Sequence, residues 1–515
     1  MPDKFYITTP IYYPNGEPHL GSIYTTMICD TLSRYHRLRG DDTFFLTGTD
    51  EHGTKMAKAA AAEGVEPGEL ADRYAAIFRD VWRELDITHD DFIRTTEPRH
   101  KTQVTRIVER LVASGDIYLG SYGGWYDEGQ EEFITETAAK ASDYKSAISG
   151  RPLSRYTEES YFFRLSKYAP QVLSHIEAHP EFIRPESRRN EVISKLRSGI
   201  DDLSISRASL KWGIPLPNDP RHVIYVWIDA LSNYITALGY ASDEDALFRK
   251  FWPADVHVIG KDILWFHTVY WPAMLLALGL ALPKTVAAHG WWVTKSGAKG
   301  GKSTGGITTL PEIRVLRERY GLDAFRFYLL RAAPFGSDLE WNEAELDKSF
   351  NELANVVGNC LNRTIKMIGQ YRQGTVPAVG DVEEIDQPLV AQTEKLSPAL
   401  SDAYGRLALQ ECAMLPVELA RATNGYIDTT APFKLRKELD KAKRLDTVLN
   451  RSAQAIKNAL VGLLPVLPEK ATTGLRQLGI EPGTRTLDEL LGTPLPPGHR
   501  LSEGVPLFPK VQTKE

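Results

Sequence analysis

Two lysines, a Ser-Thr pair and several glycines stand close together in GAKGGKSTGG, from Gly297 to Gly306. Ammonium groups and the backbone amides of glycine-rich loops bind phosphates, so the segment predicts phosphate chemistry. A Walker A phosphate loop is disfavoured, because Gly297 and Gly301 enclose three residues where that motif has four. Thr304-Gly305-Gly306 would also break the helix that such a loop must open. A solvated surface loop remains the alternative for this segment.

A second candidate phosphate site is Pro18-His19-Leu20-Gly21-Ser22, at the start of a predicted helix. His19 can donate a hydrogen bond to a phosphate, Gly21 lets a ligand approach the backbone, and a helix N-terminus favours an anion. By itself, His19 is more typical of a helix start whose hydrogen bonds are satisfied. The two candidates are far apart in sequence, so the fold would have to bring them together.

The elements around these residues alternate between strand and helix patterns. FYITTPIYY and Thr43–Leu46 are strand-like and flank a helical pattern that Gly40 closes. The alternation resumes in HVIYVWIDA, DVHVIG and KTVAAHGWW. These patterns predict a Rossmann-like, doubly wound parallel sheet in two halves. The loops PNGEPHLGS, TGTDEHG, WIDALSNY and GKDI should then meet at the carboxyl ends of the strands, where such sheets bind ligands.

Two further regions are distinct in composition. An insertion rich in aromatic and charged residues separates the halves of the sheet, and helical patterns dominate after Lys348. The predicted organisation is a first half of the Rossmann domain, an insertion, a second half, the lysine-loop region, a C-terminal all-helical domain and an irregular tail, at residues 1–114, 115–217, 218–290, 291–347, 348–483 and 484–515.

Composition excludes several classes of protein. The chain has 515 residues, a net charge of -6 and three cysteines, so neither a disulfide framework nor a globally basic nucleic-acid binder fits. The N-terminus lacks the pattern of an export signal, and the apolar run from Trp271 to Leu282 is too short to cross a bilayer. The sequence therefore predicts a cytoplasmic protein with no membrane partner.

The histidine and lysine elements together resemble the two signature motifs of class I aminoacyl-tRNA synthetases, HIGH and KMSKS, which read here as HLGS and KGGKS. YYPNGEPHLGSIYTT, FFLTGTDEHG, IRTTEPRH, WGIPLP, YVWIDALSNYI, HVIGKDILWFHTVYWPAML and HGWW resemble the methionyl-tRNA synthetase family, from about Phe5 to Gly479. The resemblance implies ATP-dependent ligation of L-methionine to initiator and elongator methionine tRNA through methionyl-adenylate. It also implies Mg²⁺ bound with ATP and an anticodon-binding role for the helical domain.

The resemblance also assigns site residues. The catalytic set is His19, Ser22, Lys299, Lys302 and Ser303. The ATP-binding set is His19, Gly21, Gly260, Asp262, Val293 and Lys302. Asp50 would receive the methionine ammonium group, and the rest of the methionine-binding set is Ile11, Tyr13, Trp227, Ala230, Leu231, Tyr234, Ile263 and His267. Without the resemblance, core packing is the better interpretation of Trp227 and Ile263.

The resemblance places anticodon contacts at Asn359, Arg363 and Phe433. Phe433 stands where relatives commonly carry tryptophan, and a phenyl ring can also stack on a base. The segment from Phe433 to Lys457 contains eight basic and three acidic residues, which predicts a local basic surface despite the acidic net charge. The basic set is Lys434, Arg436, Lys437, Lys441, Lys443, Arg444, Arg451 and Lys457.

No metal site is predicted. Many relatives carry Cys-x-x-Cys zinc knuckles in the insertion, but the matching segment here has no cysteine, so no zinc is expected. Asp50-Glu51-His52 also lacks ligand spacing, since successive residues rarely converge on one ion. No C-terminal dimerisation extension is evident, which predicts a monomer.

Two departures from the family pattern leave alternatives open. Ser22 replaces the second histidine of HIGH, and Gly300-Gly301 replaces Met-Ser in the lysine loop, which increases its flexibility. An active but divergent enzyme is favoured because both lysines and Ser303 are present. The alternatives are a paralogue that binds methionine or tRNA without full activity, and a class I enzyme for another apolar amino acid such as leucine, isoleucine or valine. The short insertion disfavours the latter, since those enzymes usually carry a large editing domain there.

Overall fold

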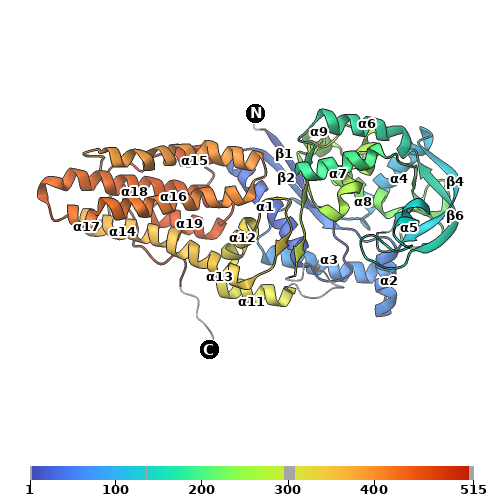
Figure 1. The fold of residues 1–515 in the computed structure, drawn as a ribbon, viewed down its shortest axis with the longest axis horizontal. Helices are drawn as coiled ribbons and strands as arrows, with labels where there is room; N and C mark the ends of the chain where they lie inside the picture. The colour runs from blue at the N-terminus through green and yellow to red at the C-terminus, as the bar shows by residue number, and fades with distance from the viewer. Residues whose placement is uncertain (1–2, 131, 135, 295–307, 510–515) are drawn as a thin grey trace. The chain divides into compact units, whose positions relative to one another are not determined.

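The computed structural model describes residues 3–130, 132–134, 136–294 and 308–509 (Figure 1). The chain divides into two compact units that interleave along the sequence. The sheet unit consists of Lys4–Pro18 and Phe44–His289, and the helical unit consists of Met1–Asp3, His19–Thr43 and Gly290–Glu515. Three predicted catalytic residues, Lys299, Lys302 and Ser303, lie outside the described residues.

A six-stranded sheet forms the centre of the sheet unit, in the order β3-β2-β1-β12-β13-β7. The pairs β2–β3, β1–β12, β12–β13 and β13–β7 are all parallel. The strands are β1 (Lys4–Thr8), β2 (Asp42–Thr49), β3 (Asp91–Arg94), β7 (Ile183–Arg184), β12 (Val256–Gly260) and β13 (Thr285–His289). The predicted parallel α/β sheet is confirmed, with one edge strand, β7, contributed from within the insertion.

One predicted strand does not belong to this sheet. HVIYVWIDA does begin with a strand, β11 (Asp219–Ile224), and continues into α8 (Val226–Thr236). However, β11 pairs antiparallel with β10 (Pro215–Leu216) and β9 (Ser206–Arg207) in a separate three-stranded sheet. The prediction that α8 follows a strand of the central sheet is therefore wrong, because an apolar run does not determine which strand pairs with it.

The insertion is built around a four-stranded antiparallel sheet in the order β5-β4-β6-β8. Its elements are β4 (Ile117–Asp127), β5 (Glu132–Ile134), α5 (Glu136–Ala141), β6 (Ser154–Phe163) and β8 (Leu203–Ser204). The remaining helices of the sheet unit are α2 (Thr54–Glu63), α3 (Pro67–Glu84), α4 (Pro98–Ala113), α6 (Leu165–Ala178), α7 (Glu186–Arg197), α9 (Ala246–Phe251) and α10 (Trp271–Ala277), with a 3-10 turn at Lys261–Ile263 (η1) and a π-helical turn at Phe266–Tyr270 (η2).

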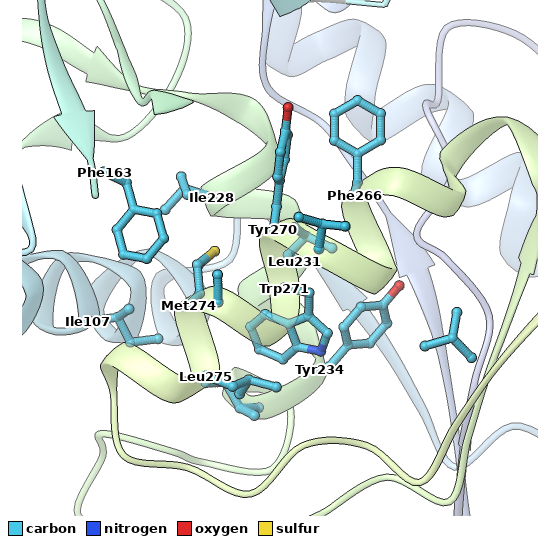
Figure 2. Close-up of a cluster of buried hydrophobic side chains, with 14 of the residues drawn as sticks. Ile107, Phe163, Ile228, Leu231, Tyr234, Phe266, Tyr270, Trp271, Met274 and Leu275 are labelled. Atoms are coloured by element: carbon cyan, nitrogen blue, oxygen red, sulfur yellow. The ribbon is translucent and has the colours of Figure 1, made fainter. Parts of the chain in front are cut away.

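Figure 2 shows the centre of the hydrophobic core of the sheet unit. Trp271 on α10 lies beside Tyr234 on α8, with ring centroids 5.9 Å apart. The surrounding side chains come from α4, β6, α8, η2 and α10; they are Ile107, Phe163, Ile228, Leu231, Phe266, Tyr270, Met274 and Leu275. Of the apolar run from Trp271 to Leu282, the residues Trp271–Leu275 are buried and the rest are only partly buried or exposed. This core holds α8 and η2 in place.

The helical unit contains α1 (Leu20–Arg39) and the C-terminal helices (Figure 1). Within it, α14 (Asn359–Arg372), α15 (Gln387–Gly405) and α16 (Leu409–Thr430) each pack against α18 (Ala442–Leu463). The later elements are β14 (Trp292–Val293), α11 (Leu310–Tyr320), α12 (Leu322–Arg331), β15 (Leu339–Glu340), α13 (Glu343–Glu352), η3 (Leu353–Gly358), α14 (Asn359–Arg372), η4 (Glu384–Asp386), α15 (Gln387–Gly405), α16 (Leu409–Thr430), α17 (Pro432–Leu435), η5 (Leu439–Lys441), α18 (Ala442–Leu463), α19 (Pro468–Gln477) and α20 (Leu487–Gly492). The predicted C-terminal helical region is confirmed.

The C-terminal segment is more ordered than its composition predicts. Where an irregular tail was expected, Leu487–Gly492 forms the short helix α20. Thr486 caps it by accepting a hydrogen bond from the backbone amide of Glu489, and Glu489 accepts one from the amide of Thr486. Among the described residues, no helix is long and apolar enough to span a membrane.

Candidate active site

The sheet unit has a topological switch point between β1 and β12. These strands are neighbours, and the sheet continues from β1 to β2 and β3 on one side and from β12 to β13 on the other. Open α/β sheets bind ligands outside the carboxyl ends of the strands at such a point. Ile11 and Tyr13 follow β1, and Gly260 and Asp262 lie at the end of β12 and just beyond it. The fold therefore places these two distant segments at one edge of the sheet.

Asp50 follows β2 at the same edge, and only 3% of its surface is exposed. Its backbone amide donates to the carbonyl oxygen of Tyr12 at 2.9 Å. Tyr12 also forms a parallel bridge with Thr49. These bonds hold the Asp50 loop against the segment that carries Ile11 and Tyr13, so the structure brings three members of the methionine-binding set into one region.

Three further members of that set form a hydrogen-bonded chain. The Tyr234 hydroxyl lies 2.7 Å from Nε2 of His267, and Nδ1 of His267 lies 3.0 Å from the carbonyl oxygen of Ile263. Because a carbonyl can only accept, Nδ1 carries the proton and Nε2 accepts from the tyrosine. Burial lowers the pKa of His267 to about 4. The ring is therefore neutral near pH 7, with one fixed tautomer.

Trp227 lies beside the hydrogen-bonded residues Tyr234, His267 and Ile263. Its indole stacks on the ring of Phe266 with centroids 3.7 Å apart and an angle of 8° between the planes. The Trp227 and His267 rings meet edge to face at 6.3 Å. Ala230 and Leu231, on the same helix, are buried. Trp227, Ile263, Ile11 and Tyr13 are only partly buried and pack against the core of the sheet unit, as the walls of a binding site would.

Gly260 and Asp262 are in contact at the end of β12. A Cβ atom added to Gly260 would lie 2.6 Å from Oδ1 of Asp262, so a larger residue here would displace that carboxylate. Asp262 lies in η1, directly after the strand. The carboxylate therefore stands at the switch point, where its oxygens can accept hydrogen bonds from ribose hydroxyl groups.

His19, in the helical unit, caps the N-terminus of α1. Its Nδ1 accepts hydrogen bonds from the backbone amides of Gly21 and Ser22 at 3.0 and 3.3 Å. The Ser22 hydroxyl accepts from the His19 amide and donates to the His19 carbonyl. A neutral His19 ring must therefore carry its proton on Nε2, and the side chain is exposed at the start of the helix.

Val293, the remaining described member of the ATP-binding set, belongs to β14 in the helical unit. This short strand pairs in parallel with β15, through Val293 and Glu340. Val293 is the penultimate residue of the described segment that precedes the lysine loop. Of the predicted ATP-binding residues, His19, Gly21 and Val293 thus belong to the helical unit, whereas Gly260 and Asp262 belong to the sheet unit with the predicted methionine-binding residues.

The predicted anticodon residues lie on the helical unit. Asn359 and Arg363 are one turn apart on α14; Asn359 is exposed, and Arg363 donates to Asn424 and forms an ion pair with Asp428. Phe433 lies on α17, and 54% of its surface is exposed. An exposed phenyl ring is suited to stacking on a base.

The predicted basic surface is smaller than its sequence indicates. Lys434, Arg436, Lys437, Lys441 and Lys443 are exposed. In contrast, Arg444 is buried, with both terminal nitrogens 2.7 Å from the carboxylate of Asp386. The ammonium group of Lys457 is also buried and donates to the carbonyl oxygens of Leu490, Leu491 and Thr493. Including Arg444 and Lys457 in that surface is therefore wrong, because both satisfy acceptors inside the fold.

Sequence reasoning missed several residues that support the site. Asp229 lies in the WIDALSNY segment and bonds to His52 and His100, which come from two other segments. Glu51 pairs with Arg94, at 2.6 and 3.0 Å. No local pattern in the sequence could indicate these long-range pairs. Among the described residues, no group of three or more His, Cys, Asp or Glu side chains is placed to hold a metal ion.

A cavity of about 430 Å³ lies elsewhere in the sheet unit. Its lining is Asn15, Lys55, Lys58, Asp127, Glu128, Gly129, Arg151, Pro152 and Ser154. None of the predicted methionine-binding residues lines it. The candidate site is therefore defined by the switch point and its polar contacts rather than by this cavity. One lining residue does contact the predicted methionine-binding set, since the Lys55 ammonium group lies 4.6 Å from the Tyr13 ring centroid.

The chain resembles known proteins over nearly its full length. The family model for class I tRNA synthetases (M) matches residues 5–142 and 137–365. A methionine–tRNA ligase from Enterococcus faecalis is 46% identical over 523 residues, which span 99% of this chain and 77% of the relative. The methionine–tRNA ligase from Bacillus subtilis is 43% identical, with 100% of this chain and 79% of the relative covered.

Solved structures agree with the sequence comparison. Methionyl-tRNA synthetase from Mycobacterium tuberculosis in complex with methionyl-adenylate superposes with a TM-score of 0.92, at 38% identity, over 99% of this chain and 100% of the other. The ligand-free form from the same organism gives a TM-score of 0.87 at 36% identity, over 99% of each chain. The chain belongs to the methionine–tRNA ligase family of class I tRNA synthetases.

Proposed function

We propose that this protein ligates L-methionine to methionine tRNA in two steps. In the first, a carboxylate oxygen of methionine attacks the α-phosphorus of ATP, the bond to the bridging oxygen of the β-phosphate breaks, and pyrophosphate leaves. In the second, a hydroxyl group of the 3′-terminal ribose of tRNA attacks the carbonyl carbon of methionyl-adenylate, and AMP leaves. Both steps depend on positioning and charge stabilisation rather than on an enzyme nucleophile.

The methionine is held by residues of the sheet unit. The buried carboxylate of Asp50 receives its ammonium group through a charge-assisted hydrogen bond. The thioether lies against Ile11, Tyr13, Trp227 and the side chains that follow on α8 and η2, namely Ala230, Leu231, Tyr234, Ile263 and His267. A neutral His267 suits an uncharged thioether, because an imidazolium would require a counter-charge in this buried position.

In this proposal, ATP is held by residues that are far apart in the sequence. Gly260, Asp262 and Val293 lie on the adenosine side. His19, Gly21, Ser22 and the N-terminus of α1 bind the phosphates, to which the helix start presents hydrogen-bond donors. Lys299 and Lys302 neutralise the departing pyrophosphate, and the Ser303 hydroxyl can donate a hydrogen bond to it. Mg²⁺ enters as part of the MgATP substrate and supplies further positive charge there.

The tRNA is recognised by the bundle between residues 348 and 483. Asn359, Arg363 and Phe433 contact anticodon bases of both initiator and elongator methionine tRNA, and the exposed lysines after Phe433 contact the backbone. We further propose that the enzyme acts in the cytoplasm as a monomer. It requires no zinc, because residues 115–217 contain no cysteine.

The observation that carries the proposal is the Tyr234–His267–Ile263 chain beside the stacked Trp227, at the carboxyl edge of the sheet that also holds Asp50. The test is exchange of labelled pyrophosphate into ATP, with methionine, leucine, isoleucine and valine each tried alone. Exchange with methionine only supports the proposal. Exchange with another apolar amino acid instead of methionine indicates a different specificity, and exchange with none indicates a paralogue that does not activate amino acids.

A further inference from the structure

The carboxylate of Asp229 is shared by two histidines inside the sheet unit. Oδ2 of Asp229 lies 2.7 Å from Nδ1 of His52, and Oδ1 lies 2.7 Å from Nε2 of His100. The exposed fractions of Asp229, His52 and His100 are 1%, 4% and 0%. Three polar side chains from distant parts of the sequence thus meet in a region from which water is excluded.

The protonation pattern follows from these contacts. Burial by itself would raise the pKa of Asp229, but the two histidines lower it to about 2. An ionised carboxylate only accepts hydrogen bonds, so His52 donates from Nδ1 and His100 donates from Nε2. The Thr236 hydroxyl lies 2.7 Å from the remaining nitrogen of His100. Each ring is therefore oriented by a bond with a charged partner, which is stronger than a neutral one.

The segments joined here are the ones that would hold methionine. His52 is two residues after Asp50, and Asp229 lies on α8 between Trp227 and Ala230. His100 lies on α4, so Asp229 ties α8 both to the Asp50 loop and to this helix. The loop is fixed from another side as well, since the Trp212 indole donates to the Glu51 carbonyl at 2.6 Å.

We propose that Asp229 is a positioning residue for methionine: through His52 it sets the distance between the Asp50 carboxylate and the side-chain contacts on α8. Asp229 does not touch the substrate in this account. The inference rests on the proposed function, because it takes Asp50 and α8 to be the two sides of the methionine site. Its consequence is selective: weakening the His52–Asp229 bond should impair methionine binding far more than ATP binding.

The test uses the purified full chain with single substitutions at His52. In His52→Asn the amide nitrogen can occupy the position of Nδ1 and still donate to Asp229, whereas His52→Ala has no donor. Pyrophosphate exchange then gives KM for methionine and for ATP. We expect His52→Ala to raise KM for methionine about ten-fold or more, the scale of one lost charged hydrogen bond, with KM for ATP within about three-fold. His52→Asn should recover most of the loss.

Asp229→Asn removes the charge that both histidines share, and Asp255→Asn is its matched control. Asp255 is also buried and accepts from the Tyr6 amide and Lys4, at 2.8 and 3.0 Å, but it precedes β12 and so lies at the opposite edge of the sheet. Both substitutions should lower the melting temperature. Only Asp229→Asn should raise KM for methionine, by about ten-fold or more.

Three results would overturn the inference: equal increases in both KM values, a His52→Asn variant as defective as His52→Ala, or an unchanged KM for methionine in every folded variant. If Asp229→Asn does not fold, the comparison of His52→Ala with His52→Asn still tests the inference. Calorimetric titration with methionine alone separates this inference from the proposed function. If the wild type binds methionine but shows no pyrophosphate exchange, the proposed activity is contradicted. The Kd values of the variants for methionine then still test the positioning role of Asp229. A wild-type chain that binds no methionine contradicts both.

Discussion

In the helical unit, the guanidinium of Arg326 lies 2.7 Å from the carboxylate of Asp30, and both side chains are completely buried. Arg326 also donates to the carbonyl oxygens of Pro465 and Val466, at 3.3 and 3.2 Å. Asp30 lies on α1, the helix that His19 caps, and Pro465 and Val466 lie between α18 and α19. One buried ion pair therefore joins the helix of the histidine motif to the helical bundle.

We expect Arg326→Leu to destabilise the protein by about 3 to 5 kcal/mol, because it leaves the Asp30 charge buried with less compensation. Urea unfolding followed by circular dichroism measures this change. Arg319→Ala is the control: Arg319 pairs with Glu343 at 3.1 Å on the surface, so its removal should cost less than about 1 kcal/mol. Equal effects of the two substitutions would contradict the importance of the buried pair.

The raised pKa of Asp323 should make the stability of the protein depend on pH. Burial raises its pKa from 3.8 to about 6, although its carboxylate accepts from the Lys470 amide at 2.6 Å. The folded state therefore binds more protons than the unfolded state between these values, and stability falls as pH rises through this window. Asp323→Asn keeps an acceptor without the charge, so it should stabilise the protein by about 1 to 3 kcal/mol at pH 8.

The gain from Asp323→Asn should shrink towards zero as the pH is lowered to about 4. Urea midpoints of the wild type and the variant at several pH values between these limits give the difference directly. A stabilisation that is the same at every pH would show that the charge of Asp323 is not its cause.

Exposure separates the basic residues of the predicted anticodon region into two expected roles. Replacing Lys437, Lys441 and Lys443 together by alanine should raise KM for tRNA about ten-fold or more and weaken its dependence on salt. Lys457→Met should leave KM for tRNA nearly unchanged and lower stability, because the Lys457 ammonium group holds the end of α20. Aminoacylation at two salt concentrations, with thermal unfolding of each variant, checks both. A large KM effect of Lys457→Met would be inconsistent with its burial.

Tyr234→Phe tests the hydrogen-bonded chain beside Trp227. The substitution removes the hydroxyl group that donates to Nε2 of His267 and leaves a buried acceptor unsatisfied. We expect KM for methionine in pyrophosphate exchange to rise about ten-fold, with KM for ATP little changed. Equal changes in the two constants would place Tyr234 in general packing rather than at the methionine site.

Lys302→Ala tests the division of roles within the proposed site. Lys302 lies outside the described residues, so this prediction comes from its place in KGGKS. Adenylate formation should be abolished while methionine binding, measured by equilibrium dialysis, survives, because the lysine acts on phosphates only. Loss of both together would contradict that division.

Much of the fold follows from local patterns. The runs that become β1, β12 and β13 are apolar and rich in β-branched residues, and each is followed by a helical period or a glycine turn. The edge strand β7 has only two residues and lies within an insertion without a clear period, so no pattern indicates it. For β11 the pattern predicts the strand but not its sheet, since pairing partners are set by tertiary contacts.

Motifs in the sequence indicate part of the candidate site, but they do not indicate contacts between distant side chains. His19, Asp50, Trp227 and His267 stand in motifs that the family resemblance identifies. Asp229 is 177 residues from His52 and 129 from His100, so only the folded chain reveals their contact. Likewise, Arg444 and Lys457 read as surface charges because lysine and arginine are seldom buried, and their internal acceptors come from other elements.

The most direct test of the account is attachment of radiolabelled methionine to tRNA by the purified chain. The substrates are initiator and elongator methionine tRNA transcripts, and the control transcript carries a changed anticodon. The account predicts ATP-dependent formation of methionyl-tRNA with both methionine tRNAs and a strong reduction with the control. No acid-precipitable label on either methionine tRNA, while a related synthetase charges the same transcripts, would contradict it.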